Sequence, residues 1–345
     1  MKYTTLPNTD IKVSKICLGT MTWGNQNTQD EGFAQMDFAL DKGVNFFDVA
    51  ELYPVPATAE TYAETERIIG NWFTKTGNRD KVILATKIAG VGDYTAHIRT
   101  TGFSKEALNE AVDNSLKRLQ TDYIDLYQLH WPERQTNYFG TRDYVHNSDD
   151  KWEDNFNEIL HNLDDIIKSG KIRQVGISNE GAWGTMRYLQ ESKTNNLPRM
   201  ITIQNAYNLL CRPFEGDLAE VAHRENIGLL AYSPMACGEL SGKYIKGIAA
   251  DNARLKLFPR FNRYSSATAT EATKRYLKIA EDHSMSLAQM ALAFVNERPF
   301  LTSNIIGATN LKQLEENIDS INITLSKEVM DAINAVHAEI PNPAT

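Results

Sequence analysis

An apolar run at residues 44–47 is followed at once by a carboxylate, Asp48, and five residues later by a phenol, Tyr53. The run is typical of a strand that is buried on both faces. A carboxylate at the end of such a strand costs several kcal/mol unless a cation pairs with it. A second apolar run, at residues 82–85, leads through one threonine to Lys87. We therefore expect Asp48 to find a cationic partner in Lys87.

Polar side chains also follow the next predicted strands. His130 follows residues 123–129, and the amides Asn179 and Gln204 stand at the ends of the two apolar runs after it. Taken alone, His130 is equally typical of a structural histidine, Asn179 of a helix N-cap and Gln204 of a loop hydrogen-bonding residue. However, Asp, Lys and His at the ends of three consecutive strands are an improbable coincidence. The joint pattern indicates a functional site.

Composition restricts the class of protein. The chain has 345 residues, 42% hydrophobic and 23% charged, which is ordinary for a globular protein. Its net charge of −8 argues against non-specific nucleic-acid binding. No apolar run approaches the roughly 20 residues that span a bilayer, and the first six residues lack the apolar core of a signal peptide. Three widely spaced cysteines, Cys17, Cys211 and Cys237, are typical of buried thiols in a reducing compartment. We expect a cytoplasmic protein whose partner is a small molecule, with neither nucleic acid nor membrane involved.

Short apolar strands alternate with longer amphipathic segments along most of the chain. After a predicted hairpin at residues 1–13, eight strands each precede a helix, which is the count of a closed (β/α)8 TIM barrel. The alternative, a doubly wound open sheet, requires a Gly-x-Gly-x-x-Gly turn after its first strand. Residues 19–24 have the wrong glycine spacing. We predict one α/β barrel domain over residues 1–345, with extra C-terminal helices.

The predicted strands lie at residues 15–18, 44–47, 82–85, 123–126, 172–176, 200–203, 227–230 and 304–306. The predicted helices lie at residues 30–42, 61–74, 104–119, 154–168, 180–191, 213–225, 271–282, 285–296 and 326–337. Ser104 and the pair Ser178 and Asn179 provide helix start signals. Three connections, at residues 88–102, 131–151 and 234–267, are longer than a barrel needs. They follow the carboxyl ends of strands, where barrels build active sites.

The segments that hold these polar residues resemble the aldo-keto reductase family. They are residues 18–21, 47–53, 115–119, 122–130, 176–179, 204–208, 231–234 and 306–309, together with Lys87. They run from the first strand to the last, so the resemblance covers essentially the whole chain. Within the family, residues 231–244 and the chain length resemble the branch that includes the potassium-channel β subunits. The resemblance implies an NADP-dependent oxidoreductase that reduces an aldehyde or ketone to an alcohol by hydride transfer.

The resemblance also implies that Tyr53, Asp48, Lys87 and His130 are catalytic. A free phenol has a pKa of about 10, and an adjacent ammonium group stabilises the phenolate. We therefore expect Lys87 to lower the pKa of Tyr53, which makes Tyr53 a better general acid. Asp48 would hold Lys87 charged and in place. His130 would donate a hydrogen bond to the substrate carbonyl.

The cofactor contacts implied by the resemblance involve NADPH/NADP+. Tyr232 resembles the platform that stacks on the nicotinamide ring, and residues 233–240 resemble the pyrophosphate clasp. Lys243 and Arg254 resemble the pair that meets the 2′-phosphate, although each is also typical of a solvated loop cation. Thr309 is equally compatible with an N-cap of a helix at residues 311–318. The full implied set is Gly19, Thr20, Met21, Asp48, Ser178, Asn179, Gln204, Tyr232, Ser233, Pro234, Met235, Gly238, Leu240, Lys243, Arg254, Gly307, Thr309, Gln313, Glu316 and Asn317.

Three other functions rely on residues of the same types. A class I aldolase would use Lys87 as a Schiff base. A metal-dependent hydrolase requires several His or carboxylate ligands at the barrel mouth, and only His130 stands at a strand end, so we expect no metal. The third is an NADP(H)-binding regulatory or sensor subunit with little turnover, which would carry the same four residues. The aromatic residues of the segment at 131–151 suggest a bulky or aromatic carbonyl substrate.

Overall fold

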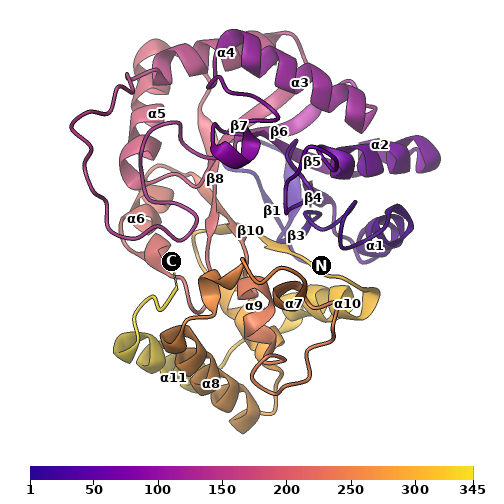
Figure 1. Ribbon diagram of the computed structural model, residues 1–345, viewed down its shortest axis with the longest axis vertical. Helices are drawn as coiled ribbons and strands as arrows, with labels where there is room; N and C mark the ends of the chain where they lie inside the picture. Colours follow the sequence, from indigo (N-terminus) through magenta and orange to yellow (C-terminus); the bar gives the residue numbers. More distant parts are fainter. Residues whose placement is uncertain (345) are drawn as a thin grey trace.

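The computed structural model describes residues 1–344 and contains a closed barrel of parallel strands surrounded by helices (Figure 1). The strand order around the barrel is β10-β3-β4-β5-β6-β7-β8-β9, so strands that are consecutive in sequence lie side by side. The predicted TIM barrel is confirmed. Its strands are β3 (Ile16–Gly19), β4 (Phe46–Asp48), β5 (Ile83–Ile88), β6 (Ile124–Leu129), β7 (Ile172–Ser178), β8 (Met200–Ala206), β9 (Gly228–Tyr232) and β10 (Leu301–Ile306).

The predicted N-terminal hairpin is also present. β1 (Tyr3–Thr5) pairs antiparallel with β2 (Lys12–Ser14) just before the first barrel strand. Leu6 and Val13 of this hairpin are fully buried and pack with the barrel-interior residues Cys17 and Phe46. Because the hairpin contributes apolar side chains to the barrel interior, it covers the amino-terminal end of the barrel and leaves the opposite end for the site.

The helices form the outer layer, and the last four of them gather on one side of the barrel, at the bottom of Figure 1. They are α1 (Gln29–Asp41), α2 (Glu64–Thr76), α3 (Lys105–Leu119), α4 (Phe156–Lys168), α5 (Ala182–Asn195), α6 (Asp217–Arg224), α7 (Arg254–Leu257), α8 (Ala267–Asp282), α9 (Leu287–Asn296), α10 (Leu311–Asp319) and α11 (Lys327–Glu339). Short 3-10 helices lie at Arg79–Lys81, Asp93–Thr95, Pro213–Glu215, Ala236–Ser241, Asn262–Tyr264 and Ser320–Asn322. Within the described residues, none of these helices combines the length and apolarity that a bilayer crossing requires.

One of the two predicted helix start signals is confirmed and the other is wrong. Ser104 is the N-cap of α3, and its hydroxyl accepts a backbone N–H of the first turn. By contrast, α5 begins at Ala182 after Gly181, whose position carries no side-chain cap. Asn179 cannot serve as this cap because its side-chain amide donates to the backbone carbonyl of His130 at the site.

Two further local predictions differ from the structure. The helix expected at residues 213–225 is broken at Gly216, whose ψ of −115° lies outside the helical region, and only Asp217–Arg224 is α-helical. Thr309 does not cap α10, because the side chain of Asn310 does so by accepting the N–H of Gln313. Thr309 instead lines the pocket described below.

Helices α2 and α3 pack so closely that a glycine is required between them. A Cβ on Gly70 of α2 would lie 2.1 Å from the backbone oxygen of Arg118 in α3. A helical glycine replaced by alanine normally gains up to about 1 kcal/mol. Here the added methyl group must separate two backbones.

We therefore expect Gly70→Ala to lower the free energy of unfolding by about 2 kcal/mol, measured by urea denaturation. Gly181→Ala is the matched control, because a Cβ there meets nothing within 4 Å and φ is −91°. The control should change stability by less than about 1 kcal/mol. An unchanged urea midpoint for Gly70→Ala would contradict the close packing of α2 on α3.

Candidate active site

The four predicted catalytic residues meet at the carboxyl end of the barrel. Asp48 is the last residue of β4, Lys87 lies near the end of β5, His130 directly follows β6, and Tyr53 stands in the loop after β4. Parallel pairing of β4 with β5 and of β5 with β6 brings these strand ends to one rim. Asp48, Tyr53 and His130 line a pocket of about 1160 Å³ at this rim.

Lys87 and Asp48 form the expected buried ion pair. Lys87 Nζ donates to Asp48 Oδ1 at 2.6 Å and to the backbone carbonyl of Val49 at 2.7 Å. The Lys87 side chain is 0% exposed, and it lies behind the pocket wall rather than on it. An ammonium group held in this way has little freedom to reach a substrate carbonyl, which disfavours a Schiff-base role for Lys87.

The second oxygen of Asp48 accepts two amide hydrogen bonds. Gln204 Nε2 donates to Asp48 Oδ2 at 2.8 Å and to Gln128 Oε1 at 3.1 Å, while Gln128 Nε2 lies 3.2 Å from Asp48 Oδ2. Both amide protons of Gln204 are therefore committed within the protein, so only its Oε1 remains to accept from a ligand. Gln128 was missed from the sequence. Its position two residues before His130, on the same face of a strand, is the signal that could have found it.

Tyr53 lies between the ion pair and His130. Lys87 Nζ is 5.0 Å from the centroid of the Tyr53 ring, and the ring of His130 meets Tyr53 edge-on with centroids 5.8 Å apart. Burial raises the pKa of Tyr53, the Asp48 charge raises it further, and Arg254 opposes the shift. The expectation of a lowered Tyr53 pKa is therefore wrong, because burial and, after it, the charge of Asp48 outweigh the effect of the nearby ammonium group. Tyr53 remains a protonated phenol at neutral pH and can act as a proton donor.

His130 is a neutral imidazole at neutral pH. Burial, followed by the nearby charge of Lys87, holds the pKa of His130 well below its ordinary value. Its Nδ1 atom is buried and has no hydrogen-bond partner among residues 1–344. A neutral imidazole carries one N–H donor, so His130 can donate one hydrogen bond to a substrate oxygen without bringing a positive charge.

The residues implied to hold a nicotinamide carboxamide form a connected network. Asn179 Nδ2 donates to the carbonyl of His130 at 2.8 Å, and Asn179 Oδ1 accepts from the hydroxyl of Tyr232 at 2.7 Å. Ser178 Oγ donates to the carbonyl of Gln204 at 2.8 Å. This network joins the ends of β6, β7, β8 and β9, so it fixes the orientation of the Tyr232 ring beside the pocket.

The pocket extends from Tyr53 to the N-terminal end of α10. Its wall contains every residue of the implied cofactor set except Leu240, which is fully buried within the 3-10 helix Ala236–Ser241. At the far end, Gln313 Oε1 accepts from the backbone and hydroxyl of Thr309, and Asn317 donates to the carbonyl of Gly307. These contacts shape the loop between β10 and α10.

The loop after β9 has an unusual backbone. Ala236, Cys237 and Gly238 have φ values of 47°, 55° and 94°, and Ser233 has a φ of 53°. The N–H groups of Ala236 and Gly238 donate to the carbonyls of Ser233 and Met235, which makes the loop a compact turn. Ser233, Met235, Cys237 and Gly238 line the pocket at the place where the resemblance implies a pyrophosphate clasp.

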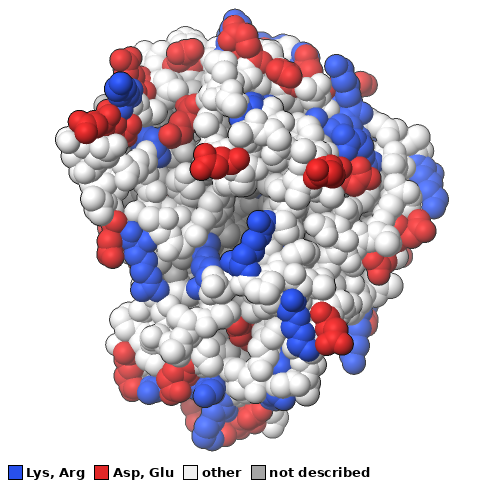
Figure 2. All heavy atoms as spheres, in the orientation of Figure 1, with Lys and Arg blue, Asp and Glu red and all other residues white. Residues whose placement is uncertain are grey.

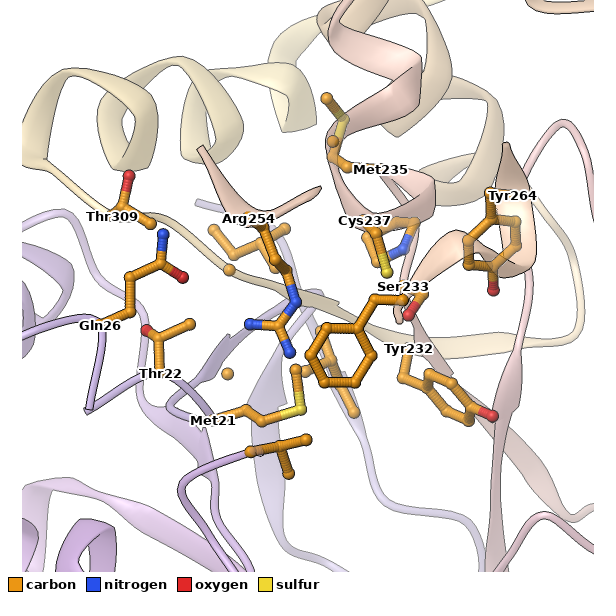
Figure 3. A pocket seen from close by; sticks show the side chains of 18 of the residues that line it. Met21, Thr22, Gln26, Tyr232, Ser233, Met235, Cys237, Arg254, Tyr264 and Thr309 are labelled. Carbon is orange, nitrogen blue, oxygen red and sulfur yellow. The ribbon is translucent and has the colours of Figure 1, made fainter. Parts of the chain in front are cut away.

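Arg254 is a cation that points into the pocket, toward Met21 (Figure 3). Its Nε and Nη1 atoms are buried and make no hydrogen bond within residues 1–344. Burial lowers the pKa of Arg254, as it does for the neighbouring Lys243, where Glu239 opposes the shift. Lys243 and Arg254 are half-buried cations. Burying the two unbonded nitrogens of Arg254 is costly unless an anion is bound, so this part of the pocket fits a phosphate group.

A second buried ion pair, missed from the sequence, supports the catalytic loop. Arg99 donates to the fully buried carboxylate of Glu51, which also accepts the N–H of Ala89 at 2.7 Å. Glu51 is two residues from Tyr53, and Arg99 belongs to the long connection after β5. The pair therefore ties that connection to the loop that carries Tyr53. The signal for it was the acidic residue between Asp48 and Tyr53.

Metal binding is not supported by the described side chains. Residues 1–344 contain no group of three His, Cys, Asp or Glu side chains that could hold a metal ion.

Comparison with known proteins agrees with this geometry. The model of the Aldo/keto reductase family matches residues 15–338. The chain is similar to Protein tas of Escherichia coli strain K12, at 45% identity over 100% of both chains. It is also similar to the uncharacterized oxidoreductase YrpG of Bacillus subtilis strain 168, at 33% identity over 97% of this chain and 96% of that protein. Norsolorinic acid reductase B of Dothistroma septosporum is 26% identical over 96% of this chain and 80% of its own length. The resemblance to the aldo-keto reductase family that the sequence motifs indicate is confirmed.

The neutral state of His130 predicts a change in the pH dependence of stability. In the unfolded chain the imidazole titrates near pH 6.5, whereas in the fold its pKa lies well below that value. As the pH falls from 7.5 to 5.5, the unfolded state gains this proton first, so His130 destabilises the fold by about 1 kcal/mol over that range. His130→Asn should lose about 1 kcal/mol less of its free energy of unfolding than the parent between these pH values, measured by urea denaturation. The same pH dependence in both proteins would show that His130 is not held neutral.

Proposed function

Since the chain belongs to the aldo/keto reductase family, we propose that it catalyses the NADPH-dependent reduction of an aldehyde or ketone to an alcohol. The observation that carries the proposal is the placement of a protonated phenol, a neutral imidazole and a buried Lys–Asp pair at one end of a single pocket. The same pocket also holds the half-buried cations Lys243 and Arg254, and Nε and Nη1 of Arg254 make no hydrogen bond within residues 1–344.

The pocket residues fit the cofactor by charge and by shape. Tyr232 would stack on the nicotinamide ring, and Gln204 Oε1 would accept from its carboxamide. The loop from Ser233 to Gly238 would surround the pyrophosphate, while Lys243 and Arg254 would meet the 2′-phosphate. When bound, the reduced nicotinamide supplies the hydride for the carbonyl carbon. The two half-buried cations support NADPH over NADH.

The proton for the nascent alcohol comes from Tyr53. His130 donates a hydrogen bond that orients the substrate carbonyl, and this bond strengthens as negative charge develops on the oxygen. An alkoxide is a stronger base than a phenolate, so it removes the proton of Tyr53 even though burial raises the phenol's pKa. Lys87, 5.0 Å from the centre of the Tyr53 ring, then stabilises the phenolate. The Lys87–Asp48 pair acts on Tyr53 and does not need to touch the substrate.

An aromatic wall beside His130 supports a bulky or aromatic carbonyl substrate. Trp131 contacts Tyr94 at a ring-centroid distance of 5.5 Å and Phe139 at 5.7 Å, and all three residues line the pocket. Aromatic faces favour planar apolar groups through offset or edge contacts. The long connections after β5 and β6, predicted from sequence to shape the site, supply these rings.

Replacement of Tyr53 tests the proposed proton transfer. Tyr53→Phe should lower kcat for reduction of an aromatic aldehyde by 10²- to 10⁴-fold, the usual contribution of a general acid. The Kd for NADPH, measured by fluorescence titration, should stay within about 2-fold of the parent because Phe retains the ring. Tyr62→Phe is the control, since Tyr62 does not line the pocket, and its kcat should match the parent.

Two outcomes would overturn this proposal. A Tyr53→Phe protein that reduces aldehydes at the parent's rate would remove Tyr53 as the acid. If the parent turned over a panel of aldehydes no faster than it exchanges cofactor, the chain would be a nicotinamide-binding regulatory subunit instead.

Replacement of Lys243 tests the choice of NADPH. Lys243→Met removes one cation from the predicted phosphate site, so the Kd for NADPH should rise roughly 10- to 100-fold. The Kd for NADH, which lacks the 2′-phosphate, should change less than about 2-fold. Lys246→Met is the matched control, because Lys246 pairs with Glu281 outside the pocket. Equal losses for both cofactors would place Lys243 away from the 2′-phosphate.

A further inference from the structure

One cation at the substrate end of the pocket has no role in the proposed reaction. Arg142 belongs to the long connection after β6 and lines the pocket beside Phe139 and Gly140. The aromatic row begins at His130, whose ring centroid is 4.9 Å from that of Trp131, and Trp131 in turn contacts Phe139. Arg142 lines the same pocket and follows Phe139 by three residues, so a planar group that extends from His130 along this wall approaches the segment that carries Arg142.

Arg142 is held by backbone carbonyls and not by a carboxylate. Its Nη2 atom donates to the carbonyl of Pro343 at 2.8 Å and to that of Asn342 at 3.2 Å. Within residues 1–344, Arg142 takes part in no ion pair. Carbonyl acceptors satisfy part of the guanidinium's hydrogen-bonding capacity but carry no net charge. The positive charge of Arg142 is consequently fixed in place and still available to an anion.

The C-terminal segment that holds Arg142 is itself anchored on the barrel. Asn342 Oδ1 accepts the backbone N–H of Arg212 at 2.8 Å, and the N–H of Ala344 donates to the carbonyl of Leu210 at 3.1 Å. Figure 1 shows the connection between β6 and α4 running down to meet the C-terminal end of the chain. Arg142 is an exposed side chain, but contacts far apart in sequence tether it to the C-terminal segment.

The charge of the pocket differs from that of the whole protein. The chain carries a net charge of −8, yet the pocket wall has the cations Arg142, Lys243, Arg254, Arg260 and Arg263 against the acids Asp48 and Glu316. Figure 2 shows Lys and Arg side chains gathered at a hollow in the middle of the face, with most acidic side chains around it. Asp48 is already paired with Lys87, and the proposed cofactor contacts use two of the five cations.

Arg142 and Arg263 both line the pocket, and both act on the thiol of Cys211. Burial raises the pKa of that thiol, and the charges of Arg263 and Arg142 oppose the rise. Arg263 also lies within 3.5 Å of the hydroxyl of Tyr232, the residue proposed to face the nicotinamide. Positive charge from two separate loops therefore converges on the substrate side of the pocket.

From these observations, we propose that Arg142 is a specificity-determining residue that binds a carboxylate on the substrate. The substrate class is then an aromatic aldehyde or ketone that carries a carboxylate at the end remote from the carbonyl. The ring lies along Trp131 and Phe139, the carbonyl meets His130, and the planar guanidinium pairs with the carboxylate. This inference rests on the proposed carbonyl reduction and names the substrate of that same site.

Matched pairs of aldehydes test the proposal. The probes are 4-carboxybenzaldehyde, the longer 3-(4-formylphenyl)propanoate, and the methyl ester of each, so that size is kept while charge is removed. With the parent protein and NADPH, kcat/KM for at least one acid should exceed that for its ester by roughly 10- to 100-fold, the usual value of a charge-assisted hydrogen bond. The preference should appear mainly in KM.

Variants separate a direct contact from the general field of the pocket. Arg142→Met should lose the preference for the acid and leave the ester's kcat/KM within about 2-fold, while Arg142→Lys should retain part of it. Arg275→Met is the matched control with the same change in net charge. Arg275 lies on α8 outside the pocket, where it pairs with Glu271 and Glu339, and its replacement should keep the parent's preference.

Each outcome decides one point. If acids and esters are reduced equally well by the parent, or if Arg142→Met keeps the full preference, the carboxylate site is wrong while the carbonyl reduction stands. If neither acids nor esters are reduced, the proposed function fails first. Loss of activity on both acid and ester in Arg142→Met, with an unchanged Kd for NADPH, would make Arg142 a structural residue of the loop and overturn its role in specificity.

Discussion

The buried ion pair between Lys87 and Asp48 is the interaction on which the site depends. Burying two charges costs several kcal/mol per ion, which their attraction offsets only when further hydrogen bonds complete the arrangement. Here the carbonyl of Val49 accepts a further hydrogen bond from the Lys87 ammonium group. The amides of Gln128 and Gln204 donate hydrogen bonds to the Asp48 carboxylate. These groups come from β4 and its following residue, β5, β6 and β8. The pair can therefore exist only in a closed barrel, and the barrel rim is held in register by the pair.

Burial and the same pair together determine the protonation states around it. Burial raises the pKa of Tyr53 and the charge of Asp48 raises it further, so Tyr53 stays a phenol. Burial of the ring, followed by the positive charge of Lys87, keeps His130 neutral, with a lowered pKa. A proton donor and a neutral hydrogen-bond donor thus stand side by side. Groups whose environments push their pKa values apart are the usual basis of acid–base roles in one pocket.

Different loops supply the two parts of the pocket that the proposals assign to cofactor and substrate. The connection after β9 supplies the left-handed turn and the cations Lys243 and Arg254, whereas the connections after β5 and β6 supply the aromatic wall and Arg142. The latter two are attached at remote points, by the Glu51–Arg99 pair and by the C-terminal segment. Different substrates can therefore be accommodated by changing loops and their anchors, while the strand ends that carry the chemistry remain as they are.

The sequence by itself determined the barrel and the four side chains proposed to be catalytic, because strand-to-helix alternation and polar strand ends are local patterns that parallel pairing gathers at one rim. Tertiary structure decided the features that depend on partners distant in sequence. The local sequence around Asn179 predicts a helix cap, yet its side-chain amide donates a hydrogen bond to the backbone carbonyl of His130. Gln128 gained a role only when β6 was placed beside β5 and near Asp48. The pKa of Tyr53 is raised, whereas the sequence analysis expected it to be lowered. Burial of the phenol and the nearby charge of Asp48 cause the rise, and both depend on the packed site, so the spacing of residues along the chain could not predict them.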